Sequence, residues 1–517
     1  MSKKHEKKPA MPRFPEPYWR ENMHLLPEFE QLDIDLTVDI AIVGGGITGI
    51  TAAYLLTKNG FKTALIEAGN LLNGTTGHTT AKVTAQHGLI YDELIQHFGE
   101  IKAQQYYQAA VDAMDFIKQT AEEHNIDCDL TEEDAYLYAT TEEYKTKLQK
   151  EHEAYKQLGI NGRWLEEIPF DIKITGALAM EKQMQFHPLK YLAPLVSYIQ
   201  ENGGLIYEKT TAVDVEENDQ PEVILRNGKK ITCKHVVAAS HYPFYDGGGL
   251  YFTRMHPDRS YIIAVKAEKE YPGGMYLSVD NPVRSLRFTD FNGEKLILIA
   301  GENHKTGQGI DTMEHYKALE QFGQEVLGIK EYPYRWSAQD LITLDKIPYI
   351  GQIKDGHPNI YVAAGYRKWG MTNGTQAALL ITDLIMHRSN QYLDLYSPSR
   401  DVKADPAIKK FIKENTDVAG ELIAGKLDFN RKRIEDMEIG EGAIVTVNGQ
   451  RAGAYKENES TIHIVDTTCR HMGCEVKWNA GDRTWDCPCH GSRYSADGTV
   501  VEGPAEEPLP PADSSDR

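Results

Sequence analysis

The chain is 517 residues long and carries 56 basic against 76 acidic residues, a formal net charge of −20. This length allows two to four domains, and the acidic balance argues against nucleic acid or an anionic membrane as a partner. No run of about 18 apolar residues occurs, so we expect no membrane-spanning segment. The six cysteines are sparse, and residues 2–8 are polar and lack the apolar core of a signal peptide, which together favour a cytoplasmic protein.

A nucleotide-binding pattern follows an extended, proline-rich arm at residues 1–35. Residues 39–43 (DIAIV) predict a buried parallel strand. The glycine run at residues 44–49 (GGGITG) leads into a helical segment, and a second strand at residues 63–66 ends at Glu67. Strand, glycine turn, helix, strand and acid in this order are the full context of the dinucleotide fingerprint.

Each fingerprint residue has a physical role in holding a dinucleotide. Gly44 permits the tight turn, Gly46 lets the backbone approach the pyrophosphate, and Gly49 lets helix and strand pack closely. The helix N-terminus presents free N–H groups to the phosphates. Glu67 is expected to bind the ribose hydroxyls.

Two further segments favour FAD over NAD. The polar, small-residue loop at residues 73–82 (NGTTGHTTAK) directly follows the fingerprint. Residues 360–365 (IYVAAG) predict another buried strand, which runs through residues 366–374 (YRKWGMTNG) into an apolar helix. A fresh helix N-terminus suits the pyrimidine edge of a flavin, where reduction places negative charge.

With the runs at residues 336–340 and 345–351, these motifs resemble the D-amino-acid-oxidase-like flavoproteins, a family that includes glycine oxidase, sarcosine oxidase and dimethylglycine dehydrogenase. The resemblance covers roughly residues 36–395. It implies an α/β fold in which a Rossmann-type FAD-binding domain is interleaved with an antiparallel-sheet substrate domain. The segments at residues 259–267, 284–291 and 295–300 have the pattern of substrate-domain strands.

The residues expected to contact FAD fall in the fingerprint, the loop after it, the adenine-side strand and the last helix. They are Gly44, Gly46, Ile47, Thr48, Gly49, Glu67, Ala68, Thr75, Thr76, His78, Thr79, Ala81, Val213, Gly365, Gly370, Met371 and Thr372.

Residues 396–425 predict a helical linker, and residues 426–517 a small all-β module with short strand-like runs and a loose tail from Pro508 onward.

Residues 469–474 (CRHMGC) and 487–492 (CPCHGS) hold four of the six cysteines. Each loop offers a Cys and a His at ligand spacing. Two thiolates and two imidazoles are the ligands of a Rieske [2Fe–2S] centre, although a structural Cys2His2 zinc site uses the same residue types.

The two loops, Tyr494 and residues 503–505 (GPA) resemble the disulfide-bearing branch of the Rieske family. The resemblance implies that Cys469 and Cys487 bind one iron, and that His471 and His490 bind the other. It also implies a Cys474–Cys489 disulfide, hydroxyl hydrogen bonds to the cluster from Ser492 and Tyr494, and a covering loop at residues 503–505. The remaining cysteines, Cys128 and Cys233, are expected to be plain buried thiols.

These cofactors favour a dehydrogenase that takes a hydride from an amine or amino-acid-like donor and passes single electrons to the cluster, and then to an unidentified acceptor. The alternative is a redox relay or sensor without turnover of a small molecule. An oxygenase needs an iron held by two His and a carboxylate, and the sequence contains no convincing motif for it.

Candidates for binding the carboxylate of an amino-acid donor are Arg367, Lys368, Arg259 and Arg254. Surface solvation or a salt bridge is the alternative role for each of them. His78 lies in a Gly-Thr-Thr-x-His context, which in dimethylglycine and sarcosine dehydrogenases carries a covalently attached flavin. Here Gly77 replaces a large aromatic residue, so a neutral, hydrogen-bonding His78 beside a non-covalent flavin is the alternative.

Overall fold

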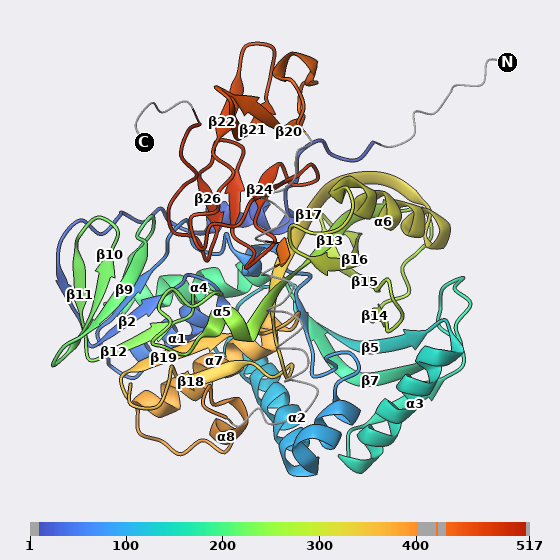
Figure 1. Ribbon diagram of the computed structural model, residues 1–517. Helices are drawn as coiled ribbons and strands as arrows, with labels where there is room; N and C mark the ends of the chain where they lie inside the picture. Colours follow the sequence, from blue (N-terminus) through green and yellow to red (C-terminus); the bar gives the residue numbers. More distant parts are fainter. Residues whose placement is uncertain (1–9, 401–419, 422–430, 513–517) are drawn as a thin grey trace.

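The computed structural model describes residues 10–400, 420–421 and 431–512. The polar start at residues 2–8 and most of the predicted helical linker lie outside the described residues. In Figure 1 the all-β C-terminal module, in orange and red, stands on one side of a larger α/β body. None of the helices in the described part of the chain combines the length and the apolar character needed to cross a bilayer.

A six-stranded sheet in the order β18-β19-β12-β2-β3-β8 forms the core of the nucleotide-binding half. The pairs from β19 to β8 are parallel, and β18 is antiparallel at the edge. All four residues of β2 and of β3 are buried, as strands covered on both faces require. The strands are β2 (Ile40–Val43), β3 (Thr63–Ile66), β8 (Leu205–Tyr207), β12 (His235–Ala238), β18 (Tyr349–Gln352) and β19 (Ile360–Ala364). A smaller sheet beside it has the order β1-β11-β10-β9, with β1 (Leu36–Thr37), β9 (Ala212–Glu217), β10 (Pro221–Leu225) and β11 (Lys230–Thr232).

The substrate half is built on a nine-stranded sheet whose strands pair antiparallel except for β14 with β5. Its main path is β17-β13-β16-β15-β14-β5-β7-β4, and β6 pairs with β7. The strands are β4 (Lys82–Val83), β5 (Thr131–Ala139), β6 (Gly162–Leu165), β7 (Gly176–Gln185), β13 (Met255–Ala267), β14 (Met275–Ser278), β15 (Arg284–Phe291), β16 (Glu294–Lys305) and β17 (Ile329–Thr343). The predicted interleaved fold is therefore confirmed.

Helices pack around both halves of the body. The α-helices are α1 (Ile47–Lys58), α2 (Tyr91–Glu123), α3 (Glu142–Gln157), α4 (Pro188–Glu201), α5 (Tyr251–Arg254), α6 (Thr312–Val326), α7 (Gly370–Ile385) and α8 (Leu393–Tyr396). The short 3-10 helices are η1 (Tyr18–Leu25), η2 (Thr75–His78) and η3 (Ile434–Asp436). The N-terminal arm reaches the body through Trp19, which is fully buried and donates its indole N–H to the Thr79 carbonyl over 2.7 Å.

The C-terminal module contains two small antiparallel sheets, as an all-β module predicts. They are β20-β21-β22 (Gly442–Val447, Gln450–Lys456, Ile462–Val465) and β23-β24-β25-β26 (Lys477–Asn479, Thr484–Asp486, Arg493–Ser495, Val500–Glu502). The second sheet lies nearer the body (Figure 1).

Residues 508–512, the described part of the segment predicted as a loose tail, make contacts with the module. Leu509 is buried and donates its backbone N–H to the Gly498 carbonyl, and Pro511 forms a β-bridge with Val465. Polar composition suggested mobility there, whereas the structure places a buried leucine and backbone hydrogen bonds in this segment.

Candidate active site

A cavity of about 870 Å³ lies between the six-stranded sheet, the substrate sheet and the C-terminal module. The glycine turn and Glu67 line one end, and strands of the substrate sheet line the other. Residues 500–506 and His471 of the C-terminal module contribute to the wall of the same cavity. Of the four predicted cluster ligands, His471 therefore borders the same cavity as the predicted FAD site.

The glycine turn forms a backbone cradle at the nucleotide end. Gly44 has a φ of +116°, and a Cβ there lies 2.4 Å from the Ala239 carbonyl oxygen. A Cβ on Gly49 lies 1.9 Å from the Gly44 carbonyl oxygen, so α1 approaches the turn as closely as only glycine allows. Gly46 precedes the first residue of α1, whose N-terminus opens toward the cavity. This cradle fits the pyrophosphate of a dinucleotide.

Glu67 sits at the end of β3 and closes the cradle. Its carboxylate accepts hydrogen bonds from the backbone N–H of Gly45 (2.7 Å) and of Gly69 (2.8 Å). Burial raises the pKa of Glu67. A half-buried acid held by two backbone donors at this position fits the role of a ribose ligand.

Most residues predicted to contact FAD line the cavity. They are Gly44, Gly46, Ile47, Thr48, Glu67, Ala68, Thr75, Thr76, His78, Thr79, Gly370 and Met371. The other five, which do not line it, are Gly49, Ala81, Val213, Gly365 and Thr372. Thr372 lies behind the lining, where its hydroxyl is 3.0 Å from His87 Nε2. Val213 does not line the cavity, but the preceding residues Thr211 and Ala212 do.

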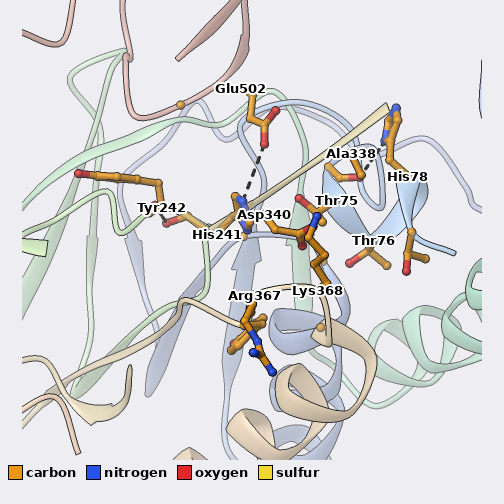
Figure 2. A pocket seen from close by; sticks show the side chains of 18 of the residues that line it. Thr75, Thr76, His78, His241, Tyr242, Ala338, Asp340, Arg367, Lys368 and Glu502 are labelled. Carbon is orange, nitrogen blue, oxygen red and sulfur yellow. Dashed lines mark hydrogen bonds and ion pairs between the residues drawn. The ribbon is translucent and has the colours of Figure 1, made fainter. Parts of the chain in front are cut away.

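Asp340, Lys368 and Asp258 form a cluster of ionisable groups in the cavity wall. Lys368 Nζ lies 3.6 Å from an Asp258 carboxylate oxygen and has no hydrogen-bond partner among the described residues. Figure 2 shows the side chains of Asp340 and Lys368 directed toward one another. Burial raises the pKa of Asp340 to about 7, and the charge of Lys368 opposes this shift. A carboxyl that titrates near neutrality inside a cavity is suited to proton transfer.

The four cations that sequence analysis proposed as ligands for the donor carboxylate lie in different places, and two of them line the cavity. Lys368 faces the cavity cluster. Arg367 also lines the cavity, but its guanidinium donates to the His87 carbonyl over 2.7 Å and points away from Asp340 in Figure 2. Arg259 is fully buried on the far side of β13, and Arg254 donates to the Pro398 carbonyl over 2.7 Å, so neither reaches the cavity.

The predicted cluster ligands converge in the C-terminal module. Cys469 and Cys487 are buried and are not in the disulfide, and the rings of His471 and His490 lie 4.9 Å apart between centroids. The Nδ1 atoms of both histidines are buried without a hydrogen-bond partner among the described residues. Buried, unpaired imidazole nitrogens beside two free thiols fit a metal cluster with mixed ligands. Cys474 and Cys489 form the predicted disulfide.

A family model described as FAD dependent oxidoreductase (DAO) matches residues 39–384. The chain belongs to this FAD-dependent oxidoreductase family. A second model, the Rieske [2Fe-2S] domain, matches residues 430–513, so this family member also carries a Rieske domain. These two matches and the ligand geometry confirm FAD and a [2Fe–2S] cluster as the cofactors, in preference to the zinc alternative.

Three known proteins show how far the similarity extends. The chain is 51% identical over 495 residues to YhfW of Bacillus subtilis (strain 168), named as a Rieske 2Fe-2S iron-sulfur protein, covering 96% of this chain and 97% of that one. It is 24% identical to gamma-glutamylputrescine oxidoreductase of Escherichia coli (strain K12), covering 71% and 88% of the two chains. The glycine oxidase structure from Geobacillus kaustophilus shares the fold, with a TM-score of 0.62, 21% identity, and coverage of 71% of this chain and 100% of that one.

In this oxidoreductase the Rieske domain docks on the outer face of the strands that form the cavity wall. Along β13 and β17, Asp258, Ser260, Ala338 and Asp340 line the cavity. The residues between them face the other way, because side chains alternate along a strand. Arg259 and Gln339 therefore contact the Rieske domain on the face of the sheet opposite to these cavity-lining residues.

The docking network is ionic and buried. Arg259 lies 3.4 Å from Asp482, 3.7 Å from Asp486 and 3.7 Å from Glu502. Arg493 of the Rieske domain joins the same carboxylates, at 2.9 Å from Asp482.

Gln339 connects this network to a ligand loop. Its side-chain carbonyl accepts from Arg259 (3.2 Å), and its amide donates to the Gly491 carbonyl (2.9 Å), one residue after His490. Two histidine rings also meet flavoprotein aromatics, His471 against Tyr242 and His490 against Phe252. Both ligand loops are thus held against the flavoprotein, by Gln339 and by these two ring contacts.

Two hydroxyl groups lie in the predicted cluster site, and that of Tyr494 points toward a ligand sulfur. The Tyr494 hydroxyl lies 3.3 Å from Cys469 Sγ, and the Ser492 hydroxyl accepts from the backbone N–H of Ala505 over 3.0 Å. The second bond ties the covering loop at residues 503–505 to the cluster site. Hydrogen bonds to cluster sulfurs stabilise the reduced, more negative state.

Removing either hydroxyl is expected to lower the reduction potential of the cluster. In Ser492→Ala or Tyr494→Phe one bond of about 1 kcal/mol is lost, which is roughly 40 mV for one electron. A redox titration followed by EPR measures the shift. Tyr455→Phe is the control, because Tyr455 is buried in the same domain but bonds Arg483. An unchanged or raised potential in both test variants contradicts the assigned role.

His78 ends η2 at the edge of the cavity. Its Nδ1 is 2.9 Å from the Gly74 carbonyl, and burial lowers the pKa of the ring, which favours the neutral form. Figure 2 shows the ring directed away from Asp340 and Lys368. This arrangement fits a neutral histidine that hydrogen-bonds its own loop.

We therefore expect the flavin to be non-covalent. Acid precipitation of the purified protein should release the yellow colour into the supernatant and leave a pellet without flavin. A yellow pellet in the native protein that becomes colourless in His78→Ala supports the tether instead.

Proposed function

We propose that this protein is an FAD-dependent dehydrogenase that oxidises an amine or amino-acid-like donor and passes the electrons singly to its Rieske cluster. Bound FAD supplies a two-electron acceptor that can release electrons one at a time. The observation that carries the proposal is the shared cavity, in which the nucleotide cradle and the cluster ligand His471 line one space. The names of the amine- and amino-acid-oxidising relatives support the donor class.

The ionisable cluster suits the reacting end of such a donor. We propose that Asp340 accepts the proton of the donor's ammonium group, because only the neutral amine can give up a hydride. Lys368 has N–H groups free for an adjacent carboxylate, and its charge favours ionised Asp340. Arg367 keeps the loop before α7 in place through the His87 carbonyl, and holds the left-handed backbone that this loop needs (φ +60°).

The direct test is an anaerobic titration with a panel of amines and amino acids. A true donor bleaches the flavin absorbance and then produces the EPR signal of the reduced cluster. If every compound leaves the flavin oxidised while dithionite reduces both centres, the protein is a relay or sensor. Boiled protein with added free FAD is the control for non-enzymatic reduction.

The same assay tests Asp340 through its pH dependence. Because the pKa of Asp340 is raised to about 7, the carboxyl is protonated below that pH and cannot accept a proton. The rate of flavin reduction should rise as the pH increases through about 7 and then level off. Asp340→Asn should lose this ionisation and slow the reaction roughly 10²-fold. If the rate of flavin reduction in Asp340→Asn still depends on pH with the same midpoint, the role of Asp340 as proton acceptor is contradicted.

A further inference from the structure

The substrate-sheet end of the cavity contains a lysine that the proposed reaction does not use. Lys82 lies on β4, lines the cavity, and donates to the Ser285 hydroxyl (2.7 Å) and the Tyr276 carbonyl (3.2 Å). These two acceptors lie on neighbouring strands, β15 and β14, and fix the ammonium group in place. Both are neutral, and an ammonium group has three N–H donors. One donor is therefore left for a ligand.

The surroundings of Lys82 are positively charged. Arg287 is almost fully buried nearby and donates to the carbonyls of Thr80 and Ala81. Among the described residues no carboxylate pairs with either cation within ion-pair distance, and burial together with the charge of Arg287 lowers the pKa of Lys82 to about 7. A buried arginine beside a half-buried lysine, with no anion between them, is costly, and a bound anion reduces that cost.

The two other lysines that line the cavity each lie within ion-pair distance of a carboxylate. Lys346 pairs with Glu93, and Lys368 lies beside Asp258. Ser278, Ser285 and Asn303 line the same region as Lys82 and offer neutral polar groups. Lys82 is thus the cavity-lining lysine that has no carboxylate partner among the described residues.

We propose that Lys82 binds a second acid group of the donor, so that the donor is an acidic amino acid or an amine with a distal carboxylate. This inference rests on the proposed function, because it takes the molecule bound at Lys82 to be the electron donor. Lys368 and Asp340 then hold the reacting end, and Lys82 selects the far end.

Non-reacting probes test the site without a known donor. Glutarate, with two carboxylates, and butyrate, with one, are titrated into the FAD-loaded full chain, and binding is followed by the change in flavin absorbance. We expect glutarate to bind at least about tenfold more tightly than butyrate, as one charge-assisted hydrogen bond implies. Lys82→Gln should abolish this difference and leave butyrate affinity within about twofold. Lys82→Arg should retain part of it.

Lys346→Gln is the matched control, because it removes a cavity lysine that already has a carboxylate partner. The preference for glutarate should survive in it. Flavin content and thermal unfolding report whether each variant is folded, and Lys82→Met replaces Lys82→Gln if that variant loses flavin. Equal binding of the two acids by the native protein, no response to either, or a preference that survives in Lys82→Gln, overturns the proposal.

The two hypotheses fail in different ways. If no amine bleaches the flavin but Lys82 still governs the preference for glutarate, the anion site stands and the dehydrogenase proposal fails. If amines reduce the flavin without any preference for a distal carboxylate, only the role of Lys82 is lost.

Discussion

Cys487→Ser protein is expected to be purified with flavin but without a [2Fe–2S] cluster. Cys487 is buried in the second ligand loop, and a serine hydroxyl is a poor substitute for a thiolate on iron. The cluster needs all four ligands, so the iron content should fall from about two per chain to near zero. Iron analysis and EPR after reduction measure the loss.

The control for this variant is Cys233→Ser. Cys233 is fully buried, burial raises the pKa of its thiol to about 12, and it lies in the flavoprotein body far along the chain from the ligand loops. This variant should keep both iron and flavin. Full iron occupancy in Cys487→Ser, with an unchanged EPR signal, rules out the ligand assignment.

Arg259→Met is expected to release the Rieske domain from the flavoprotein. The guanidinium is 0% exposed and faces Asp482, Asp486 and Glu502, which Arg493 alone cannot neutralise. Breaking a buried ion pair from one side costs about 3–5 kcal/mol. Electron transfer from flavin to cluster should slow at least tenfold while the cluster potential stays unchanged, because no cluster ligand is altered.

Two further variants separate docking from general stability. Arg259→Lys keeps the charge but loses the forked geometry, so it should restore part of the rate. Arg163→Met removes an exposed pair with Asp134 and should change stability by less than about 1 kcal/mol. If electrons pass from flavin to cluster in Arg259→Met at the native rate, the docking role of Arg259 is contradicted, whatever the thermal stability of the variant.

The parts of the site that were predicted from sequence are those whose chemistry lies in short, contiguous motifs. These motifs are the dinucleotide fingerprint, from the glycine turn to Glu67, and the two Cys/His loops. Each specifies a local backbone conformation and a set of ligand residues within a short segment. Local spacing was therefore enough to predict both cofactors, and most of the residues predicted to contact FAD line the cavity.

The residues that sequence analysis misassigned or missed depend on long-range packing. Arg259 was expected to bind substrate, but its partner Asp482 is 223 positions away, and one step along β13 turns its side chain away from the cavity. Asp340 lay in a run that was recognised only as part of the family pattern. Alternation along a strand places it and Ala338 on one face, but which face borders the cavity depends on the neighbouring strands.

The most direct test of the account is intramolecular electron transfer from flavin to cluster. The flavin of the anaerobic protein is photoreduced with EDTA by a light pulse, without need for a known donor, and the cluster is followed by rapid-freeze EPR. The shared cavity and the rigid docking predict that the cluster is reduced at a rate independent of protein concentration. A cluster that stays oxidised beside reduced flavin, or a rate that rises in proportion to protein concentration, contradicts the account.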